Sequence, residues 1–169
     1  MNEDVEVVHY AITAMVELFK EYDYRLQKIE KKYTNDPDDP VILEEYCDFL
    51  KEYLSQGFME KQMEQIYRNQ YTQLLLKQLE QKVNLHTCVC LMENLMVQRD
   101  FFLAEKILKI MDQNWHRGEE YWIWKIRYLA ERKMGKELKQ SLQALKEEHI
   151  YLSSRGKEAL GFWLDGSKK

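Results

Sequence analysis

The stretch CVCLMENLMVQRDFFLAEKILKIM, residues 88–111, aligns without a gap on WIWKIRYLAERKMGKELKQSLQAL, residues 122–145, at an offset of 34 residues. Six of seven aligned core positions are apolar in both stretches, with Lys125 as the exception; the pairs are Cys88 with Trp122, Leu91 with Lys125, Met92 with Ile126, Leu95 with Leu129, Ala104 with Leu138, Leu108 with Leu142, and Met111 with Leu145. Self-similarity at this period indicates a helix–turn–helix repeat, which must stack on a neighbour to bury its apolar face. The sequence therefore predicts an all-α fold, an α-α superhelix of antiparallel helix pairs with about seven helices.

Composition favours a single helical protein with a real core. The 169 residues are 45% hydrophobic and 32% charged, and they include only 6 Gly and 2 Pro. A net charge of −4 gives no general attraction to nucleic acid or anionic lipid. Three cysteines are too few for a disulfide framework, so we expect a cytoplasmic location. No signal peptide and no apolar run of membrane-spanning length is found.

The N-terminal segment, residues 1–35, is a heptad helix. Its apolar residues are spaced alternately three and four apart, the pattern of helices that supercoil around each other; they are Val5, Val8, Ile12, Met15, Phe19, Tyr22, Leu26, Ile29 and Tyr33. Asp36-Pro37 is expected to end the helix. Two arrangements remain open: the seam packs on the chain's own repeats, or it forms a homodimer, where in a parallel pair Arg25 would face Glu30 of the other copy.

The remainder, residues 36–169, is divided into repeats at about 40–84, 85–118 and 119–152, with a capping helix at 153–165. The first repeat is 11 residues longer than 34. Because 11 residues are nearly three helical turns, the extra length extends one helix without rotating its apolar face. We therefore expect an unbroken helix from about residue 58 to residue 82.

The repeats resemble the tetratricopeptide family over roughly residues 41–163. Trp122 stands at the aromatic fourth position, Ala104 at the small twentieth, and Arg99-Asp100-Phe101 resembles the turn into a second helix. The family's usual glycine is replaced by Met92 and Ile126, and the closing proline is missing.

A narrower resemblance rests on the helical N-terminus, the NDPDDP turn at 35–40, the long first repeat and the closing Phe162-Trp163-Leu164. These features are similar to the cytosolic domain of PelE, the repeat-bearing subunit of Pel-type exopolysaccharide synthases. The resemblance implies a role in exopolysaccharide biosynthesis and biofilm formation, with synthase subunits such as the cyclic-di-GMP receptor PelD as partners. It also implies a place at the inner face of the membrane, through partners or through membrane helices that are not in this sequence.

The sequence contains no complete catalytic or metal-binding motif. His86, Cys88 and Cys90 offer zinc ligands, but on a helix Cys88 points away from the other two and no fourth ligand follows. Asp36, Asp38 and Asp39 lack the glycine and later glutamate of a calcium loop. No phosphate-binding or hydrolase motif occurs. We predict a protein that is not an enzyme, with no catalytic residue, metal or cofactor.

The predicted function is a protein–protein interaction scaffold. By family resemblance, the inner-helix positions that face the groove are His86, Val89, Glu93, Met96, Glu120, Ile123, Arg127 and Ala130. Arg127 is suited to hold a carboxylate of a bound protein segment. The alternative is a helical-repeat RNA-binding protein, because Trp122, Trp124 and basic residues share the third repeat. Acidic residues dilute that charge and favour a protein partner over nucleic acid; they are Glu119, Glu120, Glu131 and Glu137.

Overall fold

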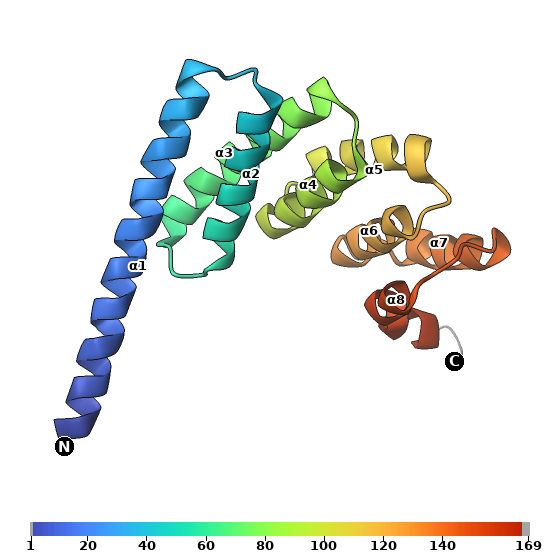
Figure 1. Ribbon diagram of the computed structural model, residues 1–169. Coiled ribbons are helices and arrows are strands. Elements are labelled where there is room, and N and C mark those ends of the chain that lie inside the picture. The colour runs from blue at the N-terminus through green and yellow to red at the C-terminus, as the bar shows by residue number, and fades with distance from the viewer. Residues whose placement is uncertain (1, 167–169) are drawn as a thin grey trace. The chain divides into compact units, whose positions relative to one another are not determined.

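The computed structural model describes residues 2–166, which form eight α-helices and no strand (Figure 1). The prediction of an all-α fold is confirmed, with one helix more than expected. The chain divides into two compact units, Met1–Gln81 and Lys82–Lys169. Among the described helices, none is both long enough and apolar enough to cross a membrane.

The first unit contains α1 (Asn2–Asn35), α2 (Pro40–Ser55) and α3 (Lys61–Gln81). The Asp39 side chain caps α2 by accepting a hydrogen bond from the Val41 N–H at 2.8 Å, and Pro40 occupies the first turn, where no N–H is needed. Gly57, with φ of 72°, lies in the turn that follows α2. α2 packs against both α1 and α3, and its buried side chains form the centre of this unit; they are Leu43, Tyr46, Cys47, Phe49, Leu50, Tyr53 and Leu54.

The long second helix of the first repeat is confirmed. α3 runs for 21 residues, whereas α5 has 15 and α7 has 13. It is continuous through Asn69 and Gln70, and it begins at Lys61, three residues later than expected. Compared with the α4–α5 pair, six of the 11 extra residues lengthen α3, two lengthen α2 and three lie in the turn between α2 and α3, so the expectation that all 11 extend one helix is only partly met.

The second unit contains α4 (Leu85–Gln98), α5 (Phe101–Trp115), α6 (Glu119–Glu131), α7 (Gly135–Glu147) and α8 (Ser154–Gly166). Neighbouring helices pack in order from α4 to α7, and α6 also packs against α4 and α8. The Asp100 side chain caps α5 through the Leu103 N–H at 3.0 Å, which confirms the expected turn. Leu91, Met92, Leu95 and Ile126 are fully buried at the centre of this unit.

The turns after α4 and α6 repeat one structure at an offset of 34 residues. Each helix ends in a left-handed residue, Arg99 (φ of 58°) and Lys133 (φ of 56°). The same two backbone hydrogen bonds close both turns. After α4, the Arg99 N–H donates to the Met96 carbonyl at 3.2 Å and the Asp100 N–H to the Leu95 carbonyl at 3.0 Å. After α6, the Lys133 N–H donates to the Ala130 carbonyl at 3.0 Å and the Met134 N–H to the Leu129 carbonyl at 2.9 Å. The sequence repeat at this period therefore has a counterpart in backbone structure.

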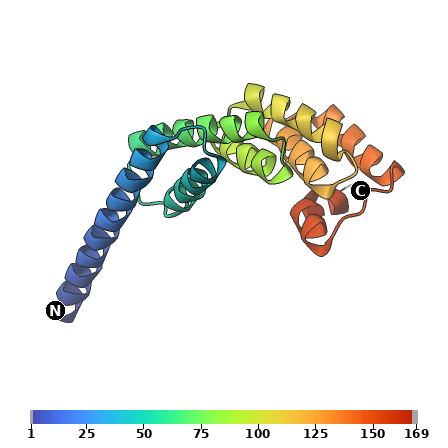
Figure 2. The ribbon, with the colours of Figure 1, turned by 45° about the horizontal axis from the view of Figure 1, so that its top comes forward.

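The heptad seam is not buried along its whole length, so the expectation of one continuous interface is wrong within the chain. Tyr22, Leu26 and Ile29 are at most 5% exposed, because α2 covers them. Tyr33 is half-buried. The five earlier residues are 38–68% exposed; they are Val5, Val8, Ile12, Met15 and Phe19. The N-terminal half of α1 extends beyond α2 and α3 (Figures 1 and 2).

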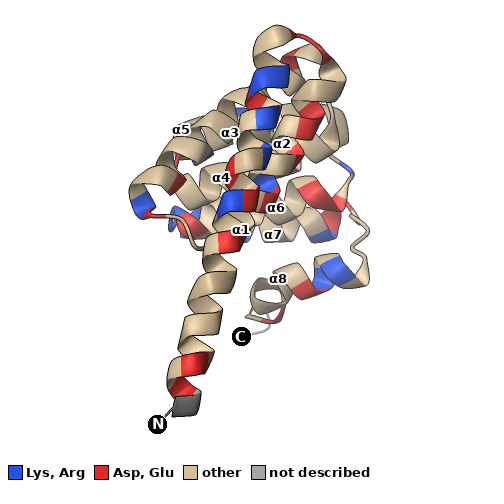
Figure 3. Ribbon diagram, turned by 60° about the vertical axis from the view of Figure 1, so that its left-hand side comes forward, with Lys and Arg blue, Asp and Glu red and all other residues tan. Residues whose placement is uncertain are grey.

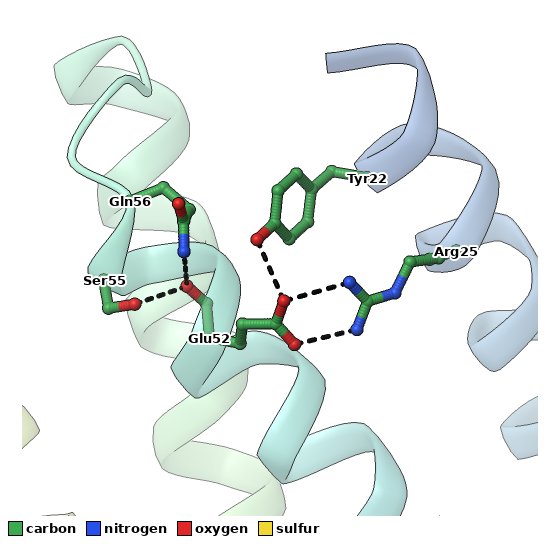
Figure 4. A network of polar contacts seen from close by, with 5 residues as sticks. All are labelled: Tyr22, Arg25, Glu52, Ser55 and Gln56. Atoms are coloured by element: carbon green, nitrogen blue, oxygen red, sulfur yellow. Dashed lines mark hydrogen bonds and ion pairs between the residues drawn. The ribbon is translucent and has the colours of Figure 1, made fainter. Parts of the chain in front are cut away.

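A polar network joins the covered half of α1 to α2 (Figure 4). Arg25 donates to the two carboxylate oxygens of Glu52 at 3.0 and 2.8 Å, and the Tyr22 hydroxyl donates to the same group at 2.9 Å. These hydrogen bonds, that of Arg25 first, lower the pKa of Glu52. Arg25 thus pairs with Glu52 of its own chain, so its guanidinium is not free for the expected contact with Glu30 of a second copy.

Candidate binding groove

Two adjoining hollows lie along α4, α6 and α8. The larger has a volume of about 740 Å³ and is lined by Glu93, Met96, Val97, Trp124, Arg127, Ala130, Glu131, Lys133, Phe162 and Trp163. The smaller has a volume of about 530 Å³ and is lined by Glu93, Ile123, Trp124, Arg127, Arg155, Glu158 and Ala159. Because Glu93, Trp124 and Arg127 line both, we treat the two hollows as one groove.

The structure brings five of the eight predicted groove residues together. Glu93, Met96, Arg127 and Ala130 line the larger hollow. Ile123 lines the smaller hollow but is only 2% exposed, so it forms the floor of the groove and does not offer the free side chain that was expected.

The remaining predicted residues lie elsewhere. His86 and Val89, near the start of α4, do not line either hollow. His86 is exposed and its Nε2 is 3.6 Å from Cys90 Sγ. Glu120 also lies outside the groove, where it forms an ion pair with Arg155 at 2.6 Å. The family register therefore predicted the groove residues correctly in the later turns of α4 and α6, but not in the first turns of these helices.

Trp124 is the most informative residue of the groove. Its side chain is 7% exposed, and its indole N–H has no hydrogen-bond partner within residues 2–166. An unpaired buried donor typically costs about 1–3 kcal/mol. The Arg127 guanidinium carbon lies 5.2 Å from the Trp124 ring centroid, one turn further along α6. Trp124 and Arg127 thus line the same groove, and the unpaired indole N–H of Trp124 is covered by neighbouring protein atoms.

Two further aromatic residues come from α8. Phe162 is 83% exposed and lines the larger hollow with Trp163, at a ring-centroid separation of 5.8 Å. The sequence indicated Phe162-Trp163-Leu164 only as part of a closing helix. Their place in the groove could not be read from sequence, because it depends on the direction in which α8 leaves the preceding turn.

The first turn of α8 is fixed by a carboxylate from α6. Glu119 accepts hydrogen bonds from the Ser153 N–H at 2.7 Å and the Ser153 hydroxyl at 2.9 Å. Ser153 Oγ in turn accepts from the Gly156 N–H at 3.2 Å, so Ser153 caps the N-terminus of α8. The contact joins the start of α6 to the start of α8, and it therefore sets the wall of the groove that α8 provides.

The cysteine and histidine residues of α4 do not assemble a metal centre. Burial raises the pKa of the Cys88 thiol to about 11, which disfavours the thiolate that metals bind. Cys88 is fully buried, whereas His86 and Cys90 contact each other on another side of α4. Within the described part of the chain, no group of three or more His, Cys, Asp or Glu residues is arranged to hold a metal ion.

Comparison of the chain with protein-family models, with curated proteins and with solved structures gives no match. The function is therefore argued from the groove itself.

Proposed function

We propose that this protein is a non-catalytic scaffold that binds a segment of another protein in the groove along α4, α6 and α8. The observation that carries the proposal is the buried, unpaired indole N–H of Trp124 beside Arg127. An orphan donor inside a protein is costly. In this proposal the Trp124 ring turns toward the groove on binding, so that a backbone carbonyl or carboxylate of the bound segment accepts from its N–H.

The chemistry of the lining defines the segment. Met96, Phe162 and Trp163 provide apolar surface for one or two side chains of the ligand. Arg127 and Lys133 provide positive charge for a carboxylate, and Glu93 and Glu131 keep the lining from being uniformly basic. Mixed charges of this kind favour a peptide over a polyanion, whose binding relies on an excess of Lys and Arg. The ligand class is therefore a protein segment with an apolar anchor next to an acidic residue.

The finer proposal is that the helix pairs form a tetratricopeptide-like superhelix in a Pel-type exopolysaccharide synthase. The repeated turns after α4 and α6 support the repeat, and the sequence resemblance alone supports the synthase. In this proposal the chain is a cytoplasmic assembly component at the inner face of the membrane, and its partner is a PelD-like receptor.

Calorimetry with the purified cytosolic part of a PelD-like receptor tests the proposal. Arg127→Glu should weaken binding at least about tenfold, equivalent to about 1.4 kcal/mol, because the cation for the ligand carboxylate becomes an anion. Lys139→Glu makes the same charge change on an exposed position of α7 and should leave affinity unchanged. Equal affinity of wild type and Arg127→Glu would contradict the groove.

Two further measurements separate the remaining explanations. Leu95→Ala truncates a fully buried side chain and should cost about 2–5 kcal/mol of stability while the folded fraction keeps its affinity. If the receptor does not bind, capture with the intact chain should recover a protein that Arg127→Glu loses and Lys139→Glu keeps. Binding of single-stranded RNA with a steep salt dependence would instead favour the RNA-binding alternative.

A further inference from the structure

The N-terminal half of α1 exposes an unusually broad apolar surface. Val5, Val8, Ile12 and Met15 are each more than half exposed. Val7, Val16 and Leu18 flank them and are also exposed. Figure 3 shows a long stretch of α1 without charge between the acidic residues near its start and the charged residues of its middle. Between residues 5 and 20 the polar side chains share one side of the helix, which includes Glu6, Thr13, Glu17 and Lys20.

Such a helix gains little stability by standing alone in water, because helices in proteins depend on burial of an apolar face. The three-and-four spacing of Val5, Val8, Ile12, Met15 and Phe19 is the geometry by which one helix receives the side chains of another. Within the first unit, α2 covers the seam only from Tyr22 onward. The cover for the earlier residues therefore comes from a helix with a matching apolar stripe.

We propose that this stripe is covered by the same stripe of a second copy of the chain, with the two α1 helices antiparallel. The orientation follows from α2. Tyr22 stacks on Tyr53 of α2 at 4.9 Å, and Phe19 contacts Phe58 at 4.5 Å, so the loop and α2 occupy the seam beyond Phe19. A parallel partner helix would run along the same face into α2. An antiparallel partner helix would instead continue beyond the N-terminal end of α1, where the first unit places no other helix (Figure 2).

The pairing also suits the side chains. In an antiparallel pair centred between Ile12 and Met15, Ile12 lies opposite Met15 of the other copy, and Val8 lies opposite Phe19. Because the pair is symmetric, each of these contacts occurs twice. The flanking Ala11, Val16 and Leu18 are apolar, so they extend the contact where coiled coils usually carry charges. The paired segment, residues 8–19, is about 12 residues or roughly 18 Å long, so it forms a small interface, and we expect dissociation in the micromolar range.

Analytical ultracentrifugation of the full chain between about 1 and 200 µM tests the association. The wild type should shift with concentration from 20.6 kDa to twice that mass. Ile12→Glu should stay monomeric, because it places a charge in the middle of the stripe. Tyr10→Glu is the matched control: Tyr10 is 78% exposed and lies about 200° around α1 from Ile12, so it should associate like the wild type. A wild type that stays at 20.6 kDa across the range overturns the proposal.

Disulfide trapping tests the orientation. The native cysteines are buried, so single cysteines introduced on α1 dominate exchange. Mixed Val8→Cys and Phe19→Cys chains should form a mixed dimer, and Val8→Cys alone should form none. Efficient linkage of Val8→Cys to itself would show a parallel pair and overturn the antiparallel arrangement. Neither experiment depends on the groove, since Arg127→Glu should associate like the wild type even if it fails to bind a partner.

Discussion

Replacing Gly156 by alanine should destabilise the second unit, although alanine is the better helix former. Gly156 is buried in the first turn of α8, beside the Glu119 carboxylate. A Cβ at this position would press on Glu119 Oε2 more closely than real Cβ atoms approach other atoms, and it would lie 3.4 Å from a methyl carbon of Leu152. The flexible carboxylate can withdraw, but it then leaves the two hydrogen bonds to Ser153.

The size of the effect follows from those two bonds. Hydrogen bonds to a charged group contribute about 1.5–3 kcal/mol each when buried, and Glu119 is only half-buried, so their joint loss should cost about 2 kcal/mol. Against this loss, alanine has a higher helix propensity than glycine, which stabilises the helix by about 0.5–1 kcal/mol. The net loss is about 1–1.5 kcal/mol, which lowers the melting temperature by about 2–6 °C for a chain of this size.

Urea unfolding followed by tryptophan fluorescence is the assay. All four tryptophans, Trp115, Trp122, Trp124 and Trp163, lie in the second unit, so the signal reports on the part of the chain that contains Gly156. Gly161→Ala, on the same helix, is the control. A Cβ there meets nothing within 4 Å, and the change should stabilise by about 0.5–1 kcal/mol.

A second background decides whether Glu119 is the cause. In Glu119→Ala the obstacle and the two bonds are both removed, so Gly156→Ala should become neutral or slightly stabilising. If Gly156→Ala costs the same in this background as in the wild type, the reasoning from the Glu119 contact is refuted.

Two further predictions concern the same unit. His116 binds Asp112 through Nδ1 and Glu148 through Nε2, each at 2.5 Å, and these bonds, that of Asp112 first, raise its pKa above 6.5. This stabilisation is complete below about pH 6.5 and is lost as the pH rises through the raised pKa, so the urea midpoint of the wild type should fall as the pH rises above about 6.5. His116→Gln should show a smaller fall, and an equal fall would exclude His116 as the source. His149, at φ of 52° after α7, holds a left-handed conformation that costs about 1 kcal/mol for a residue other than glycine. His149→Gly should therefore raise the urea midpoint, and a lower midpoint would show that the imidazole itself stabilises the turn.

Part of the candidate site could be predicted from sequence. Glu93, Met96 and Arg127 were placed in the groove by the tetratricopeptide resemblance, which names the helix positions that face it. Ile123 shares a face of α6 with Arg127 and lines the smaller hollow, but its burial at the floor depends on the side chains packed around α6, which helix register does not specify. The unpaired N–H of Trp124 and the contribution of Phe162 leave no trace in sequence, since both depend on where α8 is held.

The sequence by itself determined the helices. The apolar spacing fixed their type, Asp36-Pro37 marked the end of α1, and the added length of the first repeat indicated that α3 is longer than α5 and α7. These features are local, because each depends on residues within a few turns of one another. Only the tertiary structure decided which half of the α1 seam is covered. All nine seam residues look alike in sequence, but α2 runs back only as far as Tyr22, and the length of α2 fixes where cover ends. Likewise, Glu119 and Ser153 are 34 residues apart, and their contact exists only because α6 and α8 pack together.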